Sequence, residues 1–301
     1  MSVNEFVNKF QFKELLKSDP QTKSIVLLGT IDSQDAIISL EKSHFLFDSD
    51  HETDLNKLVK DSVIINHNDV YYWSNVLLEQ TLNEFPTAKL NLIYPATATH
   101  IKKYCTQQVH YIIETPDMYK KYVIPYIETM KGDRIKWVYN ILFEGKESET
   151  FIHHDKHPQL GFVLLPDMKW DTLNLQSLYL CCIVNRKDIS SIRDLNGSHL
   201  DFLKQLKSTI LQLVEQKYPL SQDQVRIFIH YQPSYYHFHL HIVNVAHPGL
   251  GDGIAVGKAI LLDDVIENIS IKDDYYQVRN IGYLLGENHG LWQIEGYRNS
   301  I

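Results

Sequence analysis

The chain has 301 residues, of which 44% are hydrophobic, and this length allows two domains with apolar cores. Its 37 acidic and 29 basic side chains give a net charge of -8, which argues against nonspecific binding to long nucleic acid because such binding needs an extended basic surface. The odd count of three cysteines argues against a disulfide framework and favours a reducing compartment. No apolar run approaches the ~20 residues that span a bilayer, and the N-terminus has no apolar signal core, so a soluble protein is expected.

The first 100 residues are predicted to form a small α+β domain. Apolar spacing predicts a helix over 4–17, and two apolar runs predict strands over 24–31 and 35–42 joined by a turn. The polar, acidic segment 48–57 is predicted to be a surface loop. The later elements expected in this part are a strand over 61–73, a strand over 88–95 and a short helix over 98–105.

Residues 101–130 are predicted to form a hinge and linking helix, and 131–301 a second domain. The linking helix covers 116–130 and bends at Pro125, because proline cannot donate a backbone hydrogen bond. The clearest helical spacing in the chain covers 198–218. The other expected elements are strands over 134–143, 160–166, 177–184, 224–231 and 280–285, a charged loop over 144–149 and a helix over 255–269.

The most unusual stretch is HYQPSYYHFHLHIVNV, residues 230–245. In it His237, His239 and His241 alternate with apolar residues. Because side chains of a strand point to opposite faces with a period of two, the three imidazoles are expected to share one face of a strand that buries its other face.

This row of histidines allows three interpretations. The rings could be solvent-facing side chains of a structural strand. They could ligate a metal ion such as zinc. One of them could attack a phosphate while its neighbours orient it. The alternation by itself does not decide among the three.

The written order, His-apolar-His-apolar-His-apolar-apolar, resembles the motif of the histidine triad family of nucleotide hydrolases and transferases. With its surroundings, it resembles one branch of that family, the scavenger mRNA decapping enzymes of fungal type. The further segments that carry the resemblance are YPATATHIKKY, IKWVYNIL, GFVLLPDMKWD, LYLCCIVNRKDISSIRDL and GKAILLDDVIENI. Together with the N-terminal region they cover nearly the whole chain.

The resemblance implies an α+β fold, in which a C-terminal histidine triad domain with an antiparallel sheet and helices follows a smaller N-terminal α+β domain. It also implies a domain-swapped homodimer that closes over one site at a time, with a paralogue as an alternative partner. The implied reaction is hydrolysis of the 5′ cap remnant left by 3′-to-5′ decay, a cap dinucleotide or short capped RNA. The reaction releases 7-methylguanosine monophosphate through a covalent histidine–nucleotide intermediate, without metal or other cofactor. The expected location is the cytoplasm, with the nucleus left open.

The resemblance assigns the phosphate chemistry to five residues. His239 is the expected nucleophile, because a neutral imidazole has a lone pair that can attack phosphorus. His241 is expected to contact phosphate oxygens or orient the central ring, and His237 to be a structural partner. His230, on the neighbouring strand, and Ser234, in the turn, are expected to contact the phosphates.

The cationic methylated base calls for an aromatic face and a carboxylate. Trp137 matches the family's stacking tryptophan, and cation–π attraction can reach roughly 2 kcal/mol when water is excluded. Glu147 matches the acid that accepts hydrogen bonds from the guanine edge. Without the resemblance, Glu144 and Glu149 are equal candidates.

The resemblance implies that the segment PDMK, which begins at Pro166, lines the cap. In it, Asp167 is expected to hold the ribose or base edge, Met168 to pack on the base, and Lys169 to hold the phosphates. Lys258 would supply a further positive charge, without the bidentate geometry of arginine. The N-terminal residues expected to reach the ligand on closure are Asn68, Tyr71 and Lys103.

Three rival functions remain open at the level of sequence. The chain could be a catalytically weak paralogue that binds cap or heterodimerises. It could be a metal-dependent hydrolase, which chelator sensitivity would distinguish. It could act on unmethylated dinucleoside polyphosphates, which competition between methylated and unmethylated caps would distinguish.

Overall fold

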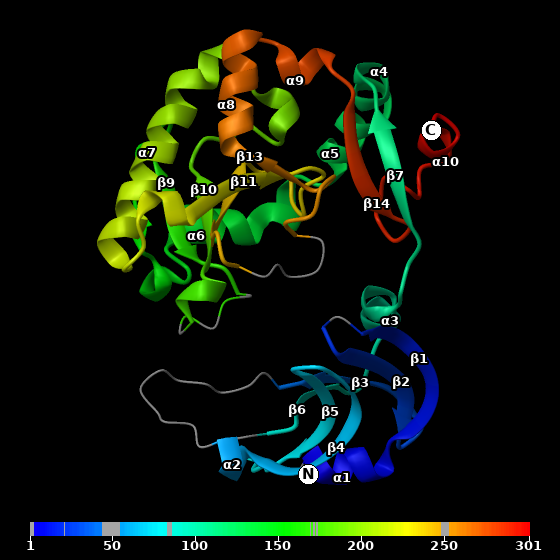
Figure 1. Cartoon of the computed structure of the whole chain (residues 1–301). Helices are drawn as coiled ribbons and strands as arrows, with labels where there is room; N and C mark the ends of the chain where they lie inside the picture. Colours follow the sequence, from blue (N-terminus) through cyan, green and yellow to red (C-terminus); the bar gives the residue numbers. More distant parts are fainter. Residues whose placement is uncertain are drawn as a thin grey trace. The chain divides into compact units, whose positions relative to one another are not determined.

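The structure, a computed structural model, describes residues 3–20, 22–43, 55–82, 86–168, 170, 172, 174–247 and 253–301. The chain divides into two compact units, residues 1–107 and 108–301, which we call the N-terminal and C-terminal units (Figure 1). Within the described ranges, no helix has both the length and the apolar character to cross a membrane.

The N-terminal unit is built on a four-stranded antiparallel sheet with the order β1-β2-β3-β6. Its elements are α1 Val3–Lys9, β1 Gln11–Asp19, β2 Ser24–Ile31, β3 Gln34–Lys42, α2 Leu55–Leu58, β4 Val59–Asn68, β5 Tyr71–Leu78, β6 Ala88–Ile93 and α3 Ala98–Tyr104. Leu16, Val26 and Ile37 are buried on the sheet, and Ile101 of α3 packs against them. The start of α3 is fixed by Thr97, whose side chain accepts the backbone N–H of His100.

Strands β4 and β5 form a separate two-stranded hairpin in the N-terminal unit. Neighbouring residues Val63 and Ile64, which pair in regular register and so point to opposite faces, are 67% and 56% exposed, and Tyr72 is 70% exposed. An isolated hairpin is marginally stable in water, and apolar surface of this kind is typical of an interaction site. The hairpin therefore carries apolar surface on both of its faces.

The C-terminal unit contains a six-stranded antiparallel sheet with the order β13-β11-β12-β10-β9-β8. Its strands are β8 His153–His154, β9 Phe162–Pro166, β10 Tyr179–Val184, β11 Val225–His230, β12 His239–Asn244 and β13 Ala259–Leu261. One face, with Leu180 and Leu240, packs against α7 Leu200–Lys217 and α8 Leu262–Ile271. The other face, with Cys181 and Ile183, packs against α6 Lys136–Glu144. The two faces therefore serve different roles, and the α6 side carries the site described below.

A second, two-stranded sheet joins β7 Val109–Glu114 to β14 Ile281–Gly286 (Figure 1). The remaining helices are α4 Pro116–Met118, α5 Ile124–Thr129, α9 Tyr275–Val278 and α10 Glu295–Arg298. β7 is the first element of the C-terminal unit and was not predicted from the sequence. The predicted α+β class is confirmed by these elements.

The expected helix over 4–17 is wrong in its second half, where β1 pairs with β2. The pairing register shifts between Phe12 and Glu14 and again between Leu15 and Lys17. Such irregularities break the alternation of exposed and buried residues, so the strand shows no period of two in the sequence. The expected strand over 61–73 is in fact two strands, because the chain reverses between Asn68 and Tyr71.

The expected strand over 134–143 is wrong, since α6 occupies this segment. Its buried residues Val138, Ile141 and Leu142 are three and four positions apart, which is the helical period. The segment 116–130 is helical as predicted, but Tyr119–Val123 form a π-helical turn just before Pro125. A wider turn there accommodates a ring that would clash with the preceding turn of an α-helix.

The expected helix over 255–269 begins only at Leu262, after the short strand β13. Predicted strands at β2, β3, β6, β9, β10, β11 and β14, and predicted helices at α3 and α7, are confirmed. The expected loop over 48–57 lies mostly outside the described residues, and its last part belongs to α2.

Candidate active site

A cavity of about 460 Å³ lies on the α6 side of the six-stranded sheet. Its wall includes apolar side chains from α6, β9 and β10, namely Ile141, Leu165 and Ile183. Nine of the predicted site residues line it: Trp137, Glu147, Pro166, Asp167, Met168, His230, Ser234, His241 and Lys258. Residues far apart in the sequence are thus gathered around one cavity large enough for a nucleotide.

His239 lies at the start of β12 and is 3% exposed. It does not itself line the cavity, but its ring contacts two residues that do, Tyr235 and His241. Its Nδ1 is 2.7 Å from the carbonyl oxygen of His237, and because that oxygen can only accept, Nδ1 carries the proton. The proton-free Nε2 is buried and has no hydrogen-bond partner within the described ranges. The ring of Tyr235 stacks on the imidazole with centroids 3.9 Å apart, and the ring of His241 lies edge-on at 5.1 Å. The tautomer of His239 therefore directs a lone pair out of Nε2.

Burial lowers the pKa of His239 to about 3, against a smaller opposing effect of its hydrogen bond to His237. The ring is thus neutral at pH 7, more completely than an unperturbed value of ~6.5 would give. We expect the imidazole nitrogen signals of His239, assigned by their loss in His239→Asn, to stay those of the neutral ring down to about pH 4 in an NMR titration. Since the unfolded chain protonates His239 near pH ~6.5, this residue should cost the fold stability as pH falls from there toward 3. Half-titration of His239 near pH 6.5 in the folded protein would contradict this reading.

His237 and His230 each direct Nε2 at a backbone carbonyl. Nε2 of His237 donates to Val184 at 2.7 Å, and Nε2 of His230 donates to Gly253 at 2.6 Å. Both nitrogens carry protons, so neither offers a metal ion a lone pair at that position. Within the described part of the chain, no group of three or more His, Cys, Asp or Glu side chains is arranged to hold a metal ion.

The expected row of three histidines on one strand is partly wrong, because β12 begins at His239 and His237 lies in the bend before it. His239 and His241 do share the face of the sheet that carries Ile183 and Cys181, which are their partners on β10. Nδ1 of His241 lies 3.1 Å from the hydroxyl oxygen of Tyr179. The ring centroids of His241 and His230 are 4.0 Å apart. The histidines are buried at 2–5% exposure, so the solvent-facing interpretation is wrong.

Trp137 lines the cavity from α6, so its expected place on a strand is corrected. It is 46% exposed, and its ring meets that of Tyr235 edge-on at 4.9 Å. Glu147 is also at the cavity, whereas its two rival acids, Glu144 and Glu149, do not line it. The backbone of Glu147 has a φ of 63°, a left-handed conformation that is uncommon for a residue with a side chain.

The PDMK segment follows β9. Pro166 and Asp167 line the cavity, and Met168 lies at its edge with a fully exposed side chain. Lys169 lies outside the described residues. Lys258 reaches the cavity from the turn before β13, and its Nζ donates to the carbonyl oxygen of Gln232 at 2.9 Å.

The chain matches two family models, the scavenger mRNA decapping enzyme N-terminal model over residues 5–107 and the scavenger mRNA decapping enzyme C-term binding model over residues 136–257. It is 39% identical to the m7GpppX diphosphatase of Schizosaccharomyces pombe over 289 residues, which cover 96% of this chain and 95% of the relative. It is 36% identical to the m7GpppX diphosphatase of Ascaris suum, over 97% of this chain and 96% of the relative. It is 32% identical to the m7GpppX diphosphatase of Homo sapiens, over 95% of this chain and 84% of the relative. The chain belongs to the family of scavenger mRNA decapping enzymes. The resemblance read from the histidine motif is therefore confirmed.

Sequence reasoning missed several residues that line the cavity of this decapping-family chain, chiefly Tyr235, Cys181 and the apolar wall. Tyr235 follows Ser234 and stands two positions before His237, so its place beside the motif was the available signal. The wall residues Ile141, Leu165 and Ile183 have no such signal, because they look like any core residue until the sheet and α6 come together.

Three predicted site residues belong to the N-terminal unit. Asn68 and Tyr71 face each other where the β4–β5 hairpin turns, and Lys103 lies in the last turn of α3. The cavity belongs to the C-terminal unit, and a role of these three residues at it stays a prediction.

Proposed function

We propose that the chain hydrolyses the 5′ cap remnant m7GpppX that remains after 3′-to-5′ mRNA decay. The observation that carries the proposal is one cavity that holds an exposed indole and two carboxylates and whose lining residues Tyr235 and His241 contact the buried, neutral imidazole of His239. The relatives named m7GpppX diphosphatase, two of which match over more than nine tenths of both chains, support the same substrate.

In the proposed reaction, Nε2 of His239 attacks the phosphorus bonded to the 5′ oxygen of 7-methylguanosine. The bond from this phosphorus to the bridging oxygen breaks, and the rest of the cap leaves as a diphosphate-ended nucleotide. The imidazole becomes cationic in this step, and the carbonyl of His237, which accepts from Nδ1, stabilises the charge. Water then cleaves the nitrogen–phosphorus bond, which releases 7-methylguanosine monophosphate and restores the neutral ring.

The remaining residues are proposed to bind the two ends of the substrate. Trp137 stacks on the cationic base, and Glu147 and Asp167 accept hydrogen bonds from it or its ribose. His230, His241, Ser234 and Lys258 hold the phosphates, with Lys169 as a further cation. His237 acts through the orientation of His239.

We propose that the chain works as a domain-swapped homodimer, with residues 1–100 as a swapped lid, 101–130 as a hinge and 131–301 as the catalytic domain. A heterodimer with a paralogue is the alternative. The exposed apolar faces of the β4–β5 hairpin support such an exchange, since they offer surface that a second copy can cover. Closure would bring Asn68, Tyr71 and Lys103 to the phosphates. Cys105, Cys181 and Cys182 form no disulfide, which agrees with the expected location in the cytoplasm.

The dimer is tested by sedimentation of the full chain at micromolar concentration, where we expect twice the mass of one chain. Ile65→Lys should shift the protein toward one chain, because a charge on the hairpin opposes burial of its apolar face. Ser208→Lys, at an exposed position of α7, is the control and should leave the mass unchanged. A parent protein that sediments as a single chain would contradict the proposal.

The function is tested by incubation of the purified chain with a methylated cap dinucleotide and analysis of the products, with and without a chelator. We expect 7-methylguanosine monophosphate and a diphosphate-ended nucleotide at equal rates in both arms. Capped RNAs of increasing length should be cleaved more slowly, because a long strand obstructs closure and the net charge of -8 provides no basic track.

Each rival function predicts a different outcome of this assay. Cap binding without turnover would favour a silent paralogue. Loss of turnover in the chelator would favour a metal-dependent hydrolase. Equal turnover of methylated and unmethylated substrates would favour a dinucleoside polyphosphate hydrolase, and undiminished rates on transcripts of hundreds of nucleotides would remove the closure argument.

A further inference from the structure

A fully buried carboxylate is hydrogen-bonded to the segment that leads to the cavity residues Ser234 and Tyr235. Glu114, the last residue of β7, is 0% exposed. Its carboxylate accepts hydrogen bonds from the hydroxyl groups of Tyr231 at 2.6 Å and Tyr283 at 2.9 Å, and from Nε2 of Gln232 at 2.9 Å. It also pairs with the guanidinium of Arg193 at 2.9 Å. Four residues from three parts of the chain therefore converge on one acidic group.

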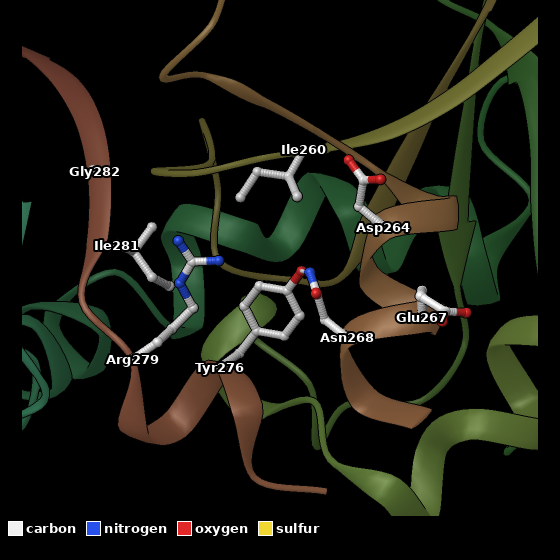
Figure 2. Close-up of a pocket in the computed structure, with 8 residues that line it drawn as sticks. All are labelled: Ile260, Asp264, Glu267, Asn268, Tyr276, Arg279, Ile281 and Gly282. Atoms are coloured by element: carbon white, nitrogen blue, oxygen red, sulfur yellow. Dashed lines mark hydrogen bonds between the residues drawn. The ribbon is translucent and has the colours of Figure 1, made fainter. Parts of the chain in front are cut away.

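Arg193 is buried as deeply as its partner and anchors a further segment. Besides the carboxylate, the guanidinium donates to the carbonyl oxygens of Tyr276 and Arg279, each at 2.7 Å. Figure 2 shows Tyr276 and Arg279 in the lining of a separate cavity of about 260 Å³. Asn268 also lines this cavity, and its side-chain amide donates to the hydroxyl of Tyr276 at 2.9 Å. The ion pair thus ties β7 to α9 and the chain leading into β14.

Two of the residues that donate to Glu114 also make backbone hydrogen bonds with Lys258, namely Tyr231 and Gln232. The backbone N–H of Tyr231 donates to the carbonyl oxygen of Lys258, and Nζ of Lys258 donates to the carbonyl oxygen of Gln232, both at 2.9 Å. Ser234 and Tyr235, which follow after Pro233, line the cavity. A shift of this short segment would therefore move the ammonium group and the turn together.

Stability alone is a weak reason for such an arrangement. Taking two charges out of water is costly, and replacing a buried ion pair by apolar groups is often neutral or stabilising. What a carboxylate with many fixed donors does provide is one definite position for each donor. Small misplacements of groups at an active site can cost about 10²-fold in rate.

We propose that Glu114 is a positioning residue for the phosphate side of the active site, acting through Tyr231 and Gln232 on Lys258 and the turn that follows. The inference rests on the proposed function, because the phosphate role of Lys258 belongs to it. It goes beyond that function by assigning a task to a residue that touches no substrate. It also makes β7, the first element after the N-terminal unit, part of the support of the site.

The test uses matched tyrosine variants of the full-length protein. Tyr231→Phe and Tyr283→Phe each remove one hydroxyl donor from the same carboxylate, but only Tyr231 lies on the segment bonded to Lys258. Gln232→Met is a second variant on the segment, and it leaves the Glu114–Arg193 pair intact. The measurements are kcat and KM for the methylated cap dinucleotide, binding of inorganic pyrophosphate, binding of 7-methylguanosine, and the melting temperature.

We expect Tyr231→Phe and Gln232→Met to lower kcat/KM by about 10- to 100-fold and to weaken pyrophosphate binding, as is typical when a supporting residue is lost. Binding of 7-methylguanosine should change less than about two-fold, because the base is held by other residues. Tyr283→Phe should leave kcat/KM within about two-fold of the parent, even if its melting temperature falls as much as that of Tyr231→Phe.

Equal kinetic losses in all three variants, in step with their melting temperatures, would overturn the proposal, as would unchanged kinetics in the two segment variants. If the parent protein does not cleave the cap at all, the proposed function fails separately. The positioning role is then decided by pyrophosphate binding, which must weaken in Tyr231→Phe and Gln232→Met and not in Tyr283→Phe.

Discussion

His239→Asn is expected to lower turnover of the methylated cap dinucleotide by about 10⁴-fold or more, as loss of a nucleophile does in other hydrolases. Affinity for the cap should stay nearly intact, because the replaced group acts on phosphorus and the base is held elsewhere. Asparagine keeps a side chain of similar reach that can donate to the carbonyl of His237, but it has no nucleophilic lone pair where Nε2 stands. The measurement is single-turnover product formation together with cap binding.

The control is His153→Asn, which makes the same change at β8, the far edge of the same sheet. This variant should keep the parent rate. If His239→Asn hydrolyses the cap dinucleotide at close to the parent rate, His239 is not the nucleophile and the phosphate chemistry must be reassigned.

Trp137→Ala is expected to weaken binding of the methylated cap by about 30-fold, which corresponds to a cation–π contribution of about 2 kcal/mol. Binding of the unmethylated cap should weaken less, because a neutral base gains little from the face of the indole. The preference for methylated over unmethylated guanine should therefore shrink. Affinities of both ligands for parent and variant measure this directly.

Phe143→Ala is the matched control for this change. Phe143 is a 52% exposed aromatic side chain on the same helix, and it does not line the cavity. It should leave both affinities unchanged. Equal discrimination by the parent and by Trp137→Ala would show that the indole packs and does not select the base.

Where a segment has one dominant helical period or is a short continuous apolar run, its type was predicted well from the sequence. Helix α7 and strands β9 and β10 are of this kind, since their apolar residues are continuous or helically spaced. Segment 134–143 was misread because it is rich in β-branched and aromatic residues, and burial of Val138 and Ile141 against the sheet outweighs that preference. β7 was missed because its exposed residues Tyr111 and Ile113 are as apolar as a buried strand, which hides the alternation.

The candidate site was predictable where a residue type carries chemistry within a recognisable motif. His239 and Trp137 were found in this way, and the structure places Trp137 at the cavity and His239 against two residues that line it, Tyr235 and His241. The charge state of His239 was not predictable, because its low pKa comes from burial, which arises only when the chain folds and Tyr235 stacks on the ring. Glu114 and Arg193 were also missed, since 79 positions separate them and neither lies in a motif.

The central claim is that His239 forms a covalent bond to phosphorus, and the stereochemical course of the reaction tests it most directly. A cap dinucleotide with a chiral phosphorothioate next to 7-methylguanosine would be hydrolysed in water enriched in oxygen-18. Two successive in-line displacements, by His239 and then by water, predict retention of configuration at phosphorus in the released monophosphate. Inversion would mean a single attack by water and would contradict the account.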